Sequence, residues 1–126
     1  MRRLLSPAVL VSAGLLAAAP AMARERDFQT PSKRIRCGAF SSGGPGAFVR
    51  CDLTFLNDRA AILHARGRGR IVKVTDAVAG PGAPVLRYGH ALRFAPFRCT
   101  SRAAGLTCRS RSGHGFFVSA QRRRTF

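Results

Sequence analysis

The stretch FRCTSRAAGLTCRS, residues Phe97–Ser110, decides the fold class. Two runs of strand-forming residues flank the segment Arg102–Gly105, which has the composition of a tight turn and ends in glycine. If the two runs pair as an antiparallel hairpin, Cys99 lies directly opposite Cys108, where the two Cβ atoms come close enough for a disulfide. The stretch therefore predicts a β-hairpin that is held by a disulfide.

A second pair of cysteines has the same kind of spacing. Cys37 and Cys51 flank a loop rich in glycine, serine and proline, residues 41–47, and pairing them places Ala39 opposite Val49. Four cysteines permit three connectivities, and the sequence alone does not choose among them. We favour pairing in chain order because it coincides with two independent turn signals. Each such bridge is worth about 3 kcal/mol of stability.

Short runs separated by Gly, Pro and Ser continue over the rest of the chain, which is typical of an all-β domain. We expect one small sandwich or barrel over residues 34–126, preceded by an extended lead-in over residues 24–33. Only Asp58–Ala65 is expected to form a helical turn or two, with Asn57 or Asp58 as its N-cap. The expected strands are Arg34–Phe40, Ala47–Phe55, Arg70–Thr75, Pro84–Tyr88, Ala91–Phe94, Phe97–Ser101, Leu106–Ser110 and Gly115–Ala120.

The N-terminal residues have the pattern of a secretory signal peptide. Arg2 and Arg3 precede the apolar run Leu4–Ala19, and the small residues Ala21 and Ala23 occupy positions −3 and −1 of a cleavage site. We expect cleavage between Ala23 and Arg24 and a bacterial protein that is secreted or periplasmic, where disulfides persist. No other apolar run is long enough to span a bilayer, so no transmembrane segment is expected.

The charge is strongly one-sided, with 22 Lys and Arg against 5 Asp and Glu. A GC-rich genome explains the excess of Arg over Lys but not the scarcity of acids. A positive field of this size favours an anionic polymer or a membrane surface as partner. The alternative is a solvated cationic surface that has no dedicated ligand. We expect a monomer without cofactor or metal.

Arginine clusters are the best candidates for a binding surface. Arg66-Gly67-Arg68-Gly69-Arg70 is similar to RGG-type segments that contact phosphate backbones. The other candidates are the arginines that flank the second hairpin, Arg98, Arg102, Arg109 and Arg111, and the run Arg122, Arg123 and Arg124. The aromatic content is low and contains no Trp, so phosphate-driven, salt-sensitive binding is expected rather than base stacking.

His114 is the one candidate catalytic residue, because the glycines on either side leave room around its imidazole. No carboxylate lies nearby in the sequence to orient it, which favours a turn histidine instead. A ribonuclease-like hydrolase built on His90 or His114 with a neighbouring arginine is the enzymatic alternative. A protein-binding inhibitor or an envelope structural component is a third possibility. The histidines lack metal-ligand spacing, so a zinc site is not expected.

Several motifs resemble a family of small secreted bacterial proteins that is classed as a domain of unknown function. The motifs are FQTPS at Phe28–Ser32, IRC at Ile35–Cys37, RCDL at Arg50–Leu53, VLRYG at Val85–Gly89, FRC at Phe97–Cys99, GLTC at Gly105–Cys108 and SGHGFF at Ser112–Phe117. The resemblance implies location and architecture but no activity. The family usually has a further cysteine pair between Cys51 and Cys99, and its absence here supports pairing in chain order. It also implies that Leu56–Gly82 is the loosest part of the molecule.

Overall fold

The computed structural model describes residues 3–15, 24–41 and 46–126. The expected cleavage site, Ala21–Ala23, lies outside these residues, as does most of the loop between the first two cysteines. Residues 3–15 contain no helix or strand, and their side chains are exposed. No helix in the described parts of the chain is long and apolar enough to cross a membrane.

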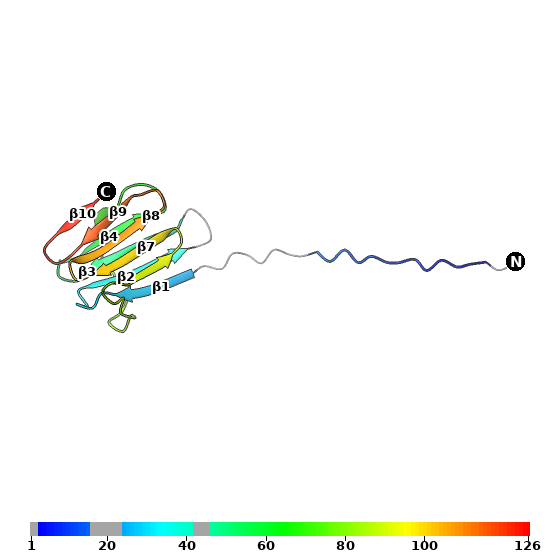
Figure 1. Cartoon of the computed structure of the whole chain (residues 1–126), viewed down its shortest axis with the longest axis horizontal. Coiled ribbons are helices and arrows are strands. Elements are labelled where there is room, and N and C mark those ends of the chain that lie inside the picture. The colour runs from blue at the N-terminus through cyan, green and yellow to red at the C-terminus, as the bar shows by residue number, and fades with distance from the viewer. Residues whose placement is uncertain (1–2, 16–23, 42–45) are drawn as a thin grey trace.

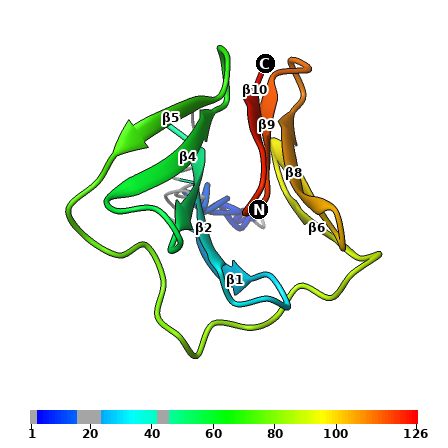
Figure 2. The same cartoon turned by 90° about the vertical axis from the view of Figure 1, so that its left-hand side faces the viewer.

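The described residues form ten strands in two antiparallel sheets, each with its strands in chain order. The N-terminal sheet contains β1 (Arg24–Gln29), β2 (Ile35–Ser41), β3 (Phe48–Leu53), β4 (Arg59–His64) and β5 (Arg70–Lys73). The C-terminal sheet contains β6 (Ala91–Phe94), β7 (Phe97–Arg102), β8 (Gly105–Ser110), β9 (Gly115–Val118) and β10 (Arg123–Thr125). Figure 1 shows the strands, and Figure 2 shows the two sheets as facing layers. The expected all-β fold is confirmed, in its sandwich form.

Alternating side chains on β3, β7 and β8 build much of the core between the layers. On β8, Leu106 and Cys108 are fully buried, whereas Arg109 is exposed. On β4, Leu63 is fully buried, and this strand packs against β8 and β9 of the other sheet. An alternation of this kind is what places one face of a strand in the core and the other in solvent.

Both predicted disulfides are present, and both predicted hairpin registers are confirmed. Cys37 pairs with Cys51 across β2 and β3, and Cys99 pairs with Cys108 across β7 and β8, each with a Cα–Cα distance of 4.1 Å. All four cysteines are buried between the sheets. Each sheet therefore has one disulfide, which links its second and third strands in chain order.

The prediction of a helical turn over Asp58–Ala65 is wrong, because residues 59–64 form strand β4. Ala60, Ala61 and Leu63 are all fully buried, and β4 pairs with β3 on one side and β5 on the other. Pairing and burial override the helix preference of alanine here. Asp58 has a φ of 55° in the turn before the strand and is not a helix N-cap. The expectation that residues 56–82 are the loosest part therefore fails for β4.

Three other boundaries differ from expectation. Part of the expected lead-in forms strand β1, which pairs along its whole length with β2. Of the expected strand Pro84–Tyr88, only Val85 is bridged, in parallel to Gln29. Strand β10 was not expected; its arginine run pairs with β9, and its sequence carries no apolar alternation.

The segment between β5 and β6 passes around the outside of the N-terminal sheet (Figure 2). Arg50 on β3 binds it through two contacts with Asp76, Nη1 to Oδ1 at 2.9 Å and Nη2 to the carbonyl oxygen at 2.7 Å. The Nε of Arg50 also donates to Asp52 Oδ1 at 2.8 Å, and Asp52 Oδ2 accepts the Val78 amide at 2.8 Å. The pairing of Asp52 with an arginine leaves no free carboxylate at this position.

Removal of one disulfide tests how much stability it supplies. We expect Cys99→Ala/Cys108→Ala to lower the free energy of unfolding by about 3 kcal/mol, because the unfolded chain regains the freedom of the closed loop. The free energy is measured by urea unfolding of the oxidised protein, with Cys37→Ala/Cys51→Ala as the counterpart. Unfolding curves that do not change on reduction would contradict this account.

Acid should release the segment that Arg50 binds. The hydrogen bond and positive charge of Arg50 lower the pKa of Asp76 below its ordinary value of 3.8. The pair therefore stabilises the fold fully above that value and loses its effect as the pH falls through the lowered pKa. We expect Asp76→Asn to flatten the acid limb of stability against pH, measured by urea unfolding at a series of pH values. An unchanged acid limb would contradict the role of this carboxylate.

Candidate anion-binding surface

Three arginines stand side by side across the outer face of the C-terminal sheet. Arg93 on β6 pairs with Arg98 on β7, and Arg98 pairs with Arg109 on β8. All three side chains are exposed. Neighbouring strands lie about 4.8 Å apart, so the three residues form a line that runs across the strands. We call these three residues the arginine row.

Like charges in directly opposed positions destabilise a sheet. Nothing in the sequence after Asp76 neutralises them, because residues 77–126 contain nine arginines and no Asp or Glu. The described salt bridges involve only Arg50, on the other sheet. The arginine row is therefore an arrangement that lowers the stability of the free protein.

The N-terminal sheet also has a like-charged pair, Arg59 opposite Lys73. There, however, Arg59 lines a surface hollow together with the acids Asp52, Asp58 and Asp76. Asp52 and Asp76 pair with Arg50, so Asp58 is the acid that can offset part of the repulsion. The two sheets therefore differ sharply in their electrostatics, and the uncompensated field belongs to the C-terminal sheet.

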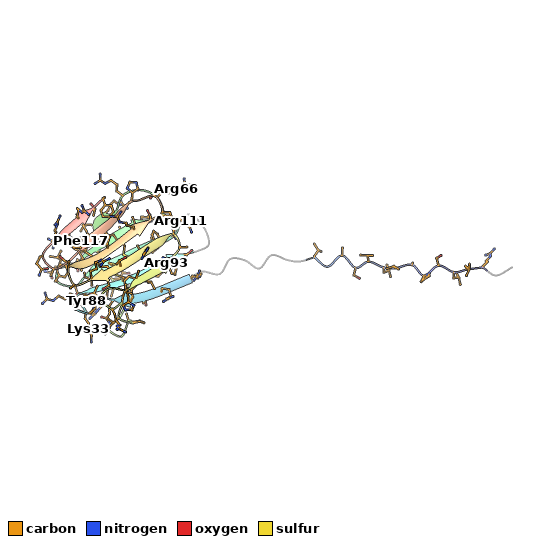
Figure 3. All side chains as sticks on the ribbon, viewed as in Figure 1. Lys33, Arg66, Tyr88, Arg93, Arg111 and Phe117 are labelled. Atoms are coloured by element: carbon orange, nitrogen blue, oxygen red, sulfur yellow. A yellow bond between two sulfur atoms is a disulfide. The ribbon has the colours of Figure 1, made fainter. Side chains whose placement is uncertain are left out.

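A hollow of about 480 Å³ adjoins the arginine row. The three arginines of the row line it together with Arg111, from the turn between β8 and β9. The amide of Arg111 donates to the carbonyl of Pro96 at 3.2 Å, which holds this turn against the turn between β6 and β7. Arg93 and Arg111 lie on the same side of the domain in Figure 3. Four guanidinium groups thus line one open surface.

The aromatic ring of Phe126 extends this surface towards β10. The guanidinium of Arg109 lies 4.9 Å from the ring centroid, and that of Arg124 lies 5.1 Å from it. Phe126 exchanges two backbone hydrogen bonds with Gly115, whose lack of a side chain leaves room for the ring. The ring thus connects the arginine row with the arginine run of β10 through cation–π contacts.

The predicted arginine candidates are brought together only in part. Arg98, Arg109, Arg111 and Arg124 lie on or beside the outer face of the C-terminal sheet. Arg68 reaches the same edge, where its Nη2 donates to the Thr125 carbonyl at 3.4 Å. The remaining candidates are exposed but lie outside the arginine row. Arg66 lies in the β4–β5 loop and Arg70 begins β5, whereas Arg122 and Arg123 lie just before and at the start of β10.

Sequence reasoning missed Arg93 as a binding residue. Arg93 joins the arginine row because β6 pairs with β7 in a register that places it opposite Arg98, across the short turn between these strands. The absence of acids from residues 77–126 was the signal that could have pointed to this sheet as a whole.

His114 lies in the turn between β8 and β9, where its carbonyl accepts the Ser110 amide at 2.9 Å. His90 lies beside Ser101, near the other end of β7. The two histidines therefore lie near opposite ends of β7, so a ribonuclease-like site would contain one of them and not both. Within the described residues, no three His, Cys, Asp or Glu side chains gather in a way that could hold a metal ion.

Comparison with known families decides the relationship of the chain. Residues 50–126 match the family of unknown function DUF6636. The chain belongs to this family. The match runs from the middle of β3 to β10 and includes both the arginine row and the second disulfide, which agrees with the resemblance seen in the sequence. No curated protein and no solved structure matches the chain.

The repulsion within the arginine row predicts that losing its middle charge stabilises the protein. We expect Arg98→Gln to raise the free energy of unfolding by about 0.5 kcal/mol at low salt, within the range of cross-strand pair effects. The gain should shrink as salt screens the charges. Arg59→Gln, which lies in a hollow that also contains acids, should give a smaller gain. Thermal unfolding at two salt concentrations measures both, and a destabilised Arg98→Gln would contradict the argument.

Proposed function

We propose that this protein is a non-enzymatic module that binds anionic polymers through the outer face of its C-terminal sheet. We further propose that it acts outside the cytoplasm, in the periplasm or the medium, after cleavage between Ala23 and Arg24. The observation that carries the proposal is the arginine row, which places three like charges in register with no acid on the same sheet. Bound phosphate, sulfate or carboxylate groups would offset the repulsion that this row creates.

The geometry favours an extended ligand over a single small anion. The arginine row runs across three strands, and the hollow beside it is open and lined by four arginines. Arginine binds phosphate and carboxylate oxygens in a fork-like geometry, so each position can hold one anionic group. Arg109 and Arg124 both contact the Phe126 ring, so the positively charged surface continues from the arginine row to β10.

Binding of this kind should depend steeply on salt, because each neutralised phosphate releases counterions. We expect the oxidised protein to bind labelled single-stranded RNA, as a model polyanion, without cleaving it. The variant Arg93→Gln/Arg98→Gln/Arg109→Gln should lower the slope of log K against log salt by about 2, or about 0.7 for each lost phosphate contact. Fluorescence anisotropy at several salt concentrations gives the slope, and a gel of the same samples shows whether the RNA stays intact.

The matched control removes three charges from the N-terminal sheet, as Arg26→Gln/Arg59→Gln/Lys73→Gln. All three side chains are exposed, so their loss should leave the fold intact. The proposal requires the control to keep most of the wild-type slope. Equal losses in both variants would show that net charge alone attracts the polymer, and RNA cleavage would favour the hydrolase instead.

A further inference from the structure

A cavity of about 200 Å³ lies at one end of the sandwich, away from the hollow beside the arginine row. Four separate segments form it: the β1–β2 turn, the residues before β6, the β7–β8 turn and the β9–β10 turn. In Figure 3, Tyr88 and Lys33 mark this end of the domain, on the other side from Arg93 and Arg111. The cavity and the arginine row are therefore separate sites.

The side chains that line the cavity are suited to an anion with hydroxyl groups. Arg34 and Arg102 contribute two guanidinium groups, and the lining contains no carboxylate. Tyr88 contributes a phenol and Gln121 an amide. In the described part of the chain, none of these four side chains makes a hydrogen bond or an ion pair. All four are exposed and therefore free to bind a ligand.

The backbone around the cavity is fixed before any ligand binds. The amide of Gly89 donates to the Ser101 carbonyl at 2.8 Å, which holds the segment of Tyr88 against β7. The β1–β2 turn is closed by a hydrogen bond from Lys33 to Thr30 at 2.8 Å.

The β9–β10 turn is closed in the same way, by a hydrogen bond from the Ser119 amide to the Arg122 carbonyl at 2.8 Å. The β7–β8 turn is also fixed at Gly105, whose φ is 154° and where any side chain would collide with Phe117 and Val118. The backbone of this site therefore loses little entropy when a ligand binds, and the cost that remains is the ordering of its exposed side chains.

We propose that this cavity binds a small phosphate monoester that carries neighbouring hydroxyl groups, such as a glycerol phosphate. The two guanidinium groups would hold the phosphate oxygens, and the phenol and amide would hydrogen-bond to the hydroxyls. A volume of about 200 Å³ equals that of about seven water molecules, which is enough to hold a group of this size. The same chemical group occurs in free form and at the end of a glycerol phosphate polymer.

The test is isothermal titration of the oxidised protein with sn-glycerol 3-phosphate, with glycerol and inorganic phosphate as partial ligands. We expect the phosphate monoester to bind at least tenfold more tightly than inorganic phosphate, and glycerol not to bind. Arg34→Gln and Arg102→Gln should each weaken binding about tenfold, as expected for the loss of a hydrogen bond to a charged group. Tyr88→Phe should weaken it by a smaller factor.

Arg26→Gln is the matched control, because it removes one exposed arginine outside the cavity. It should leave binding unchanged, and thermal unfolding of each variant should show that the fold is intact. Absence of binding, equal binding of inorganic phosphate, or an equal loss in Arg26→Gln would overturn the proposal. A short glycerol phosphate oligomer separates the two sources: tighter binding that depends on Arg102 indicates a polymer end, and equal binding indicates the free monoester.

Discussion

The rest of the structure depends on the two disulfides in the middle of the core. The buried side chains between the sheets are mostly small or medium in size, and a chain of this length buries only a modest core. The formal net charge of +17 adds a repulsion that works against compaction. Covalent links reduce the freedom of the unfolded chain whatever the charge or salt, so they can support a surface whose charges repel one another.

The two sheets differ in how their charges are balanced, and the uncompensated arginine row lies on the C-terminal sheet. The N-terminal sheet holds all five acids of the chain on its strands or on the segments beside them, and Arg50 uses two of these acids to fix the segment that leads to the other sheet. The C-terminal sheet has no acids, and none of its arginines forms an ion pair among the described residues. One sheet has ion pairs that stabilise it, and the other carries positive charge that no acid on the same sheet offsets.

The sequence predicts those features that depend on neighbours along the chain. Both hairpins, their registers and the cysteine pairs follow from turn residues and spacing, and the structure confirms them. Strand β4 could not be predicted in this way, because its Ala-rich sequence prefers a helix until two neighbouring strands and the opposite sheet enclose it. The arginine row needs the registers of three strands at once, and the end cavity needs four segments that only the docking of the sheets brings together.

Each sheet consists of one continuous stretch of chain, with every strand paired to its neighbour in sequence. Contacts of this local kind form quickly, since little loop entropy is lost before they are made. Each cysteine finds its partner within the same hairpin, 9 or 14 residues away, before the two sheets need to meet. A chain that reaches an oxidising compartment unfolded can therefore form its correct bridges early, and incorrect bridges would require contact between two stretches that have not yet docked.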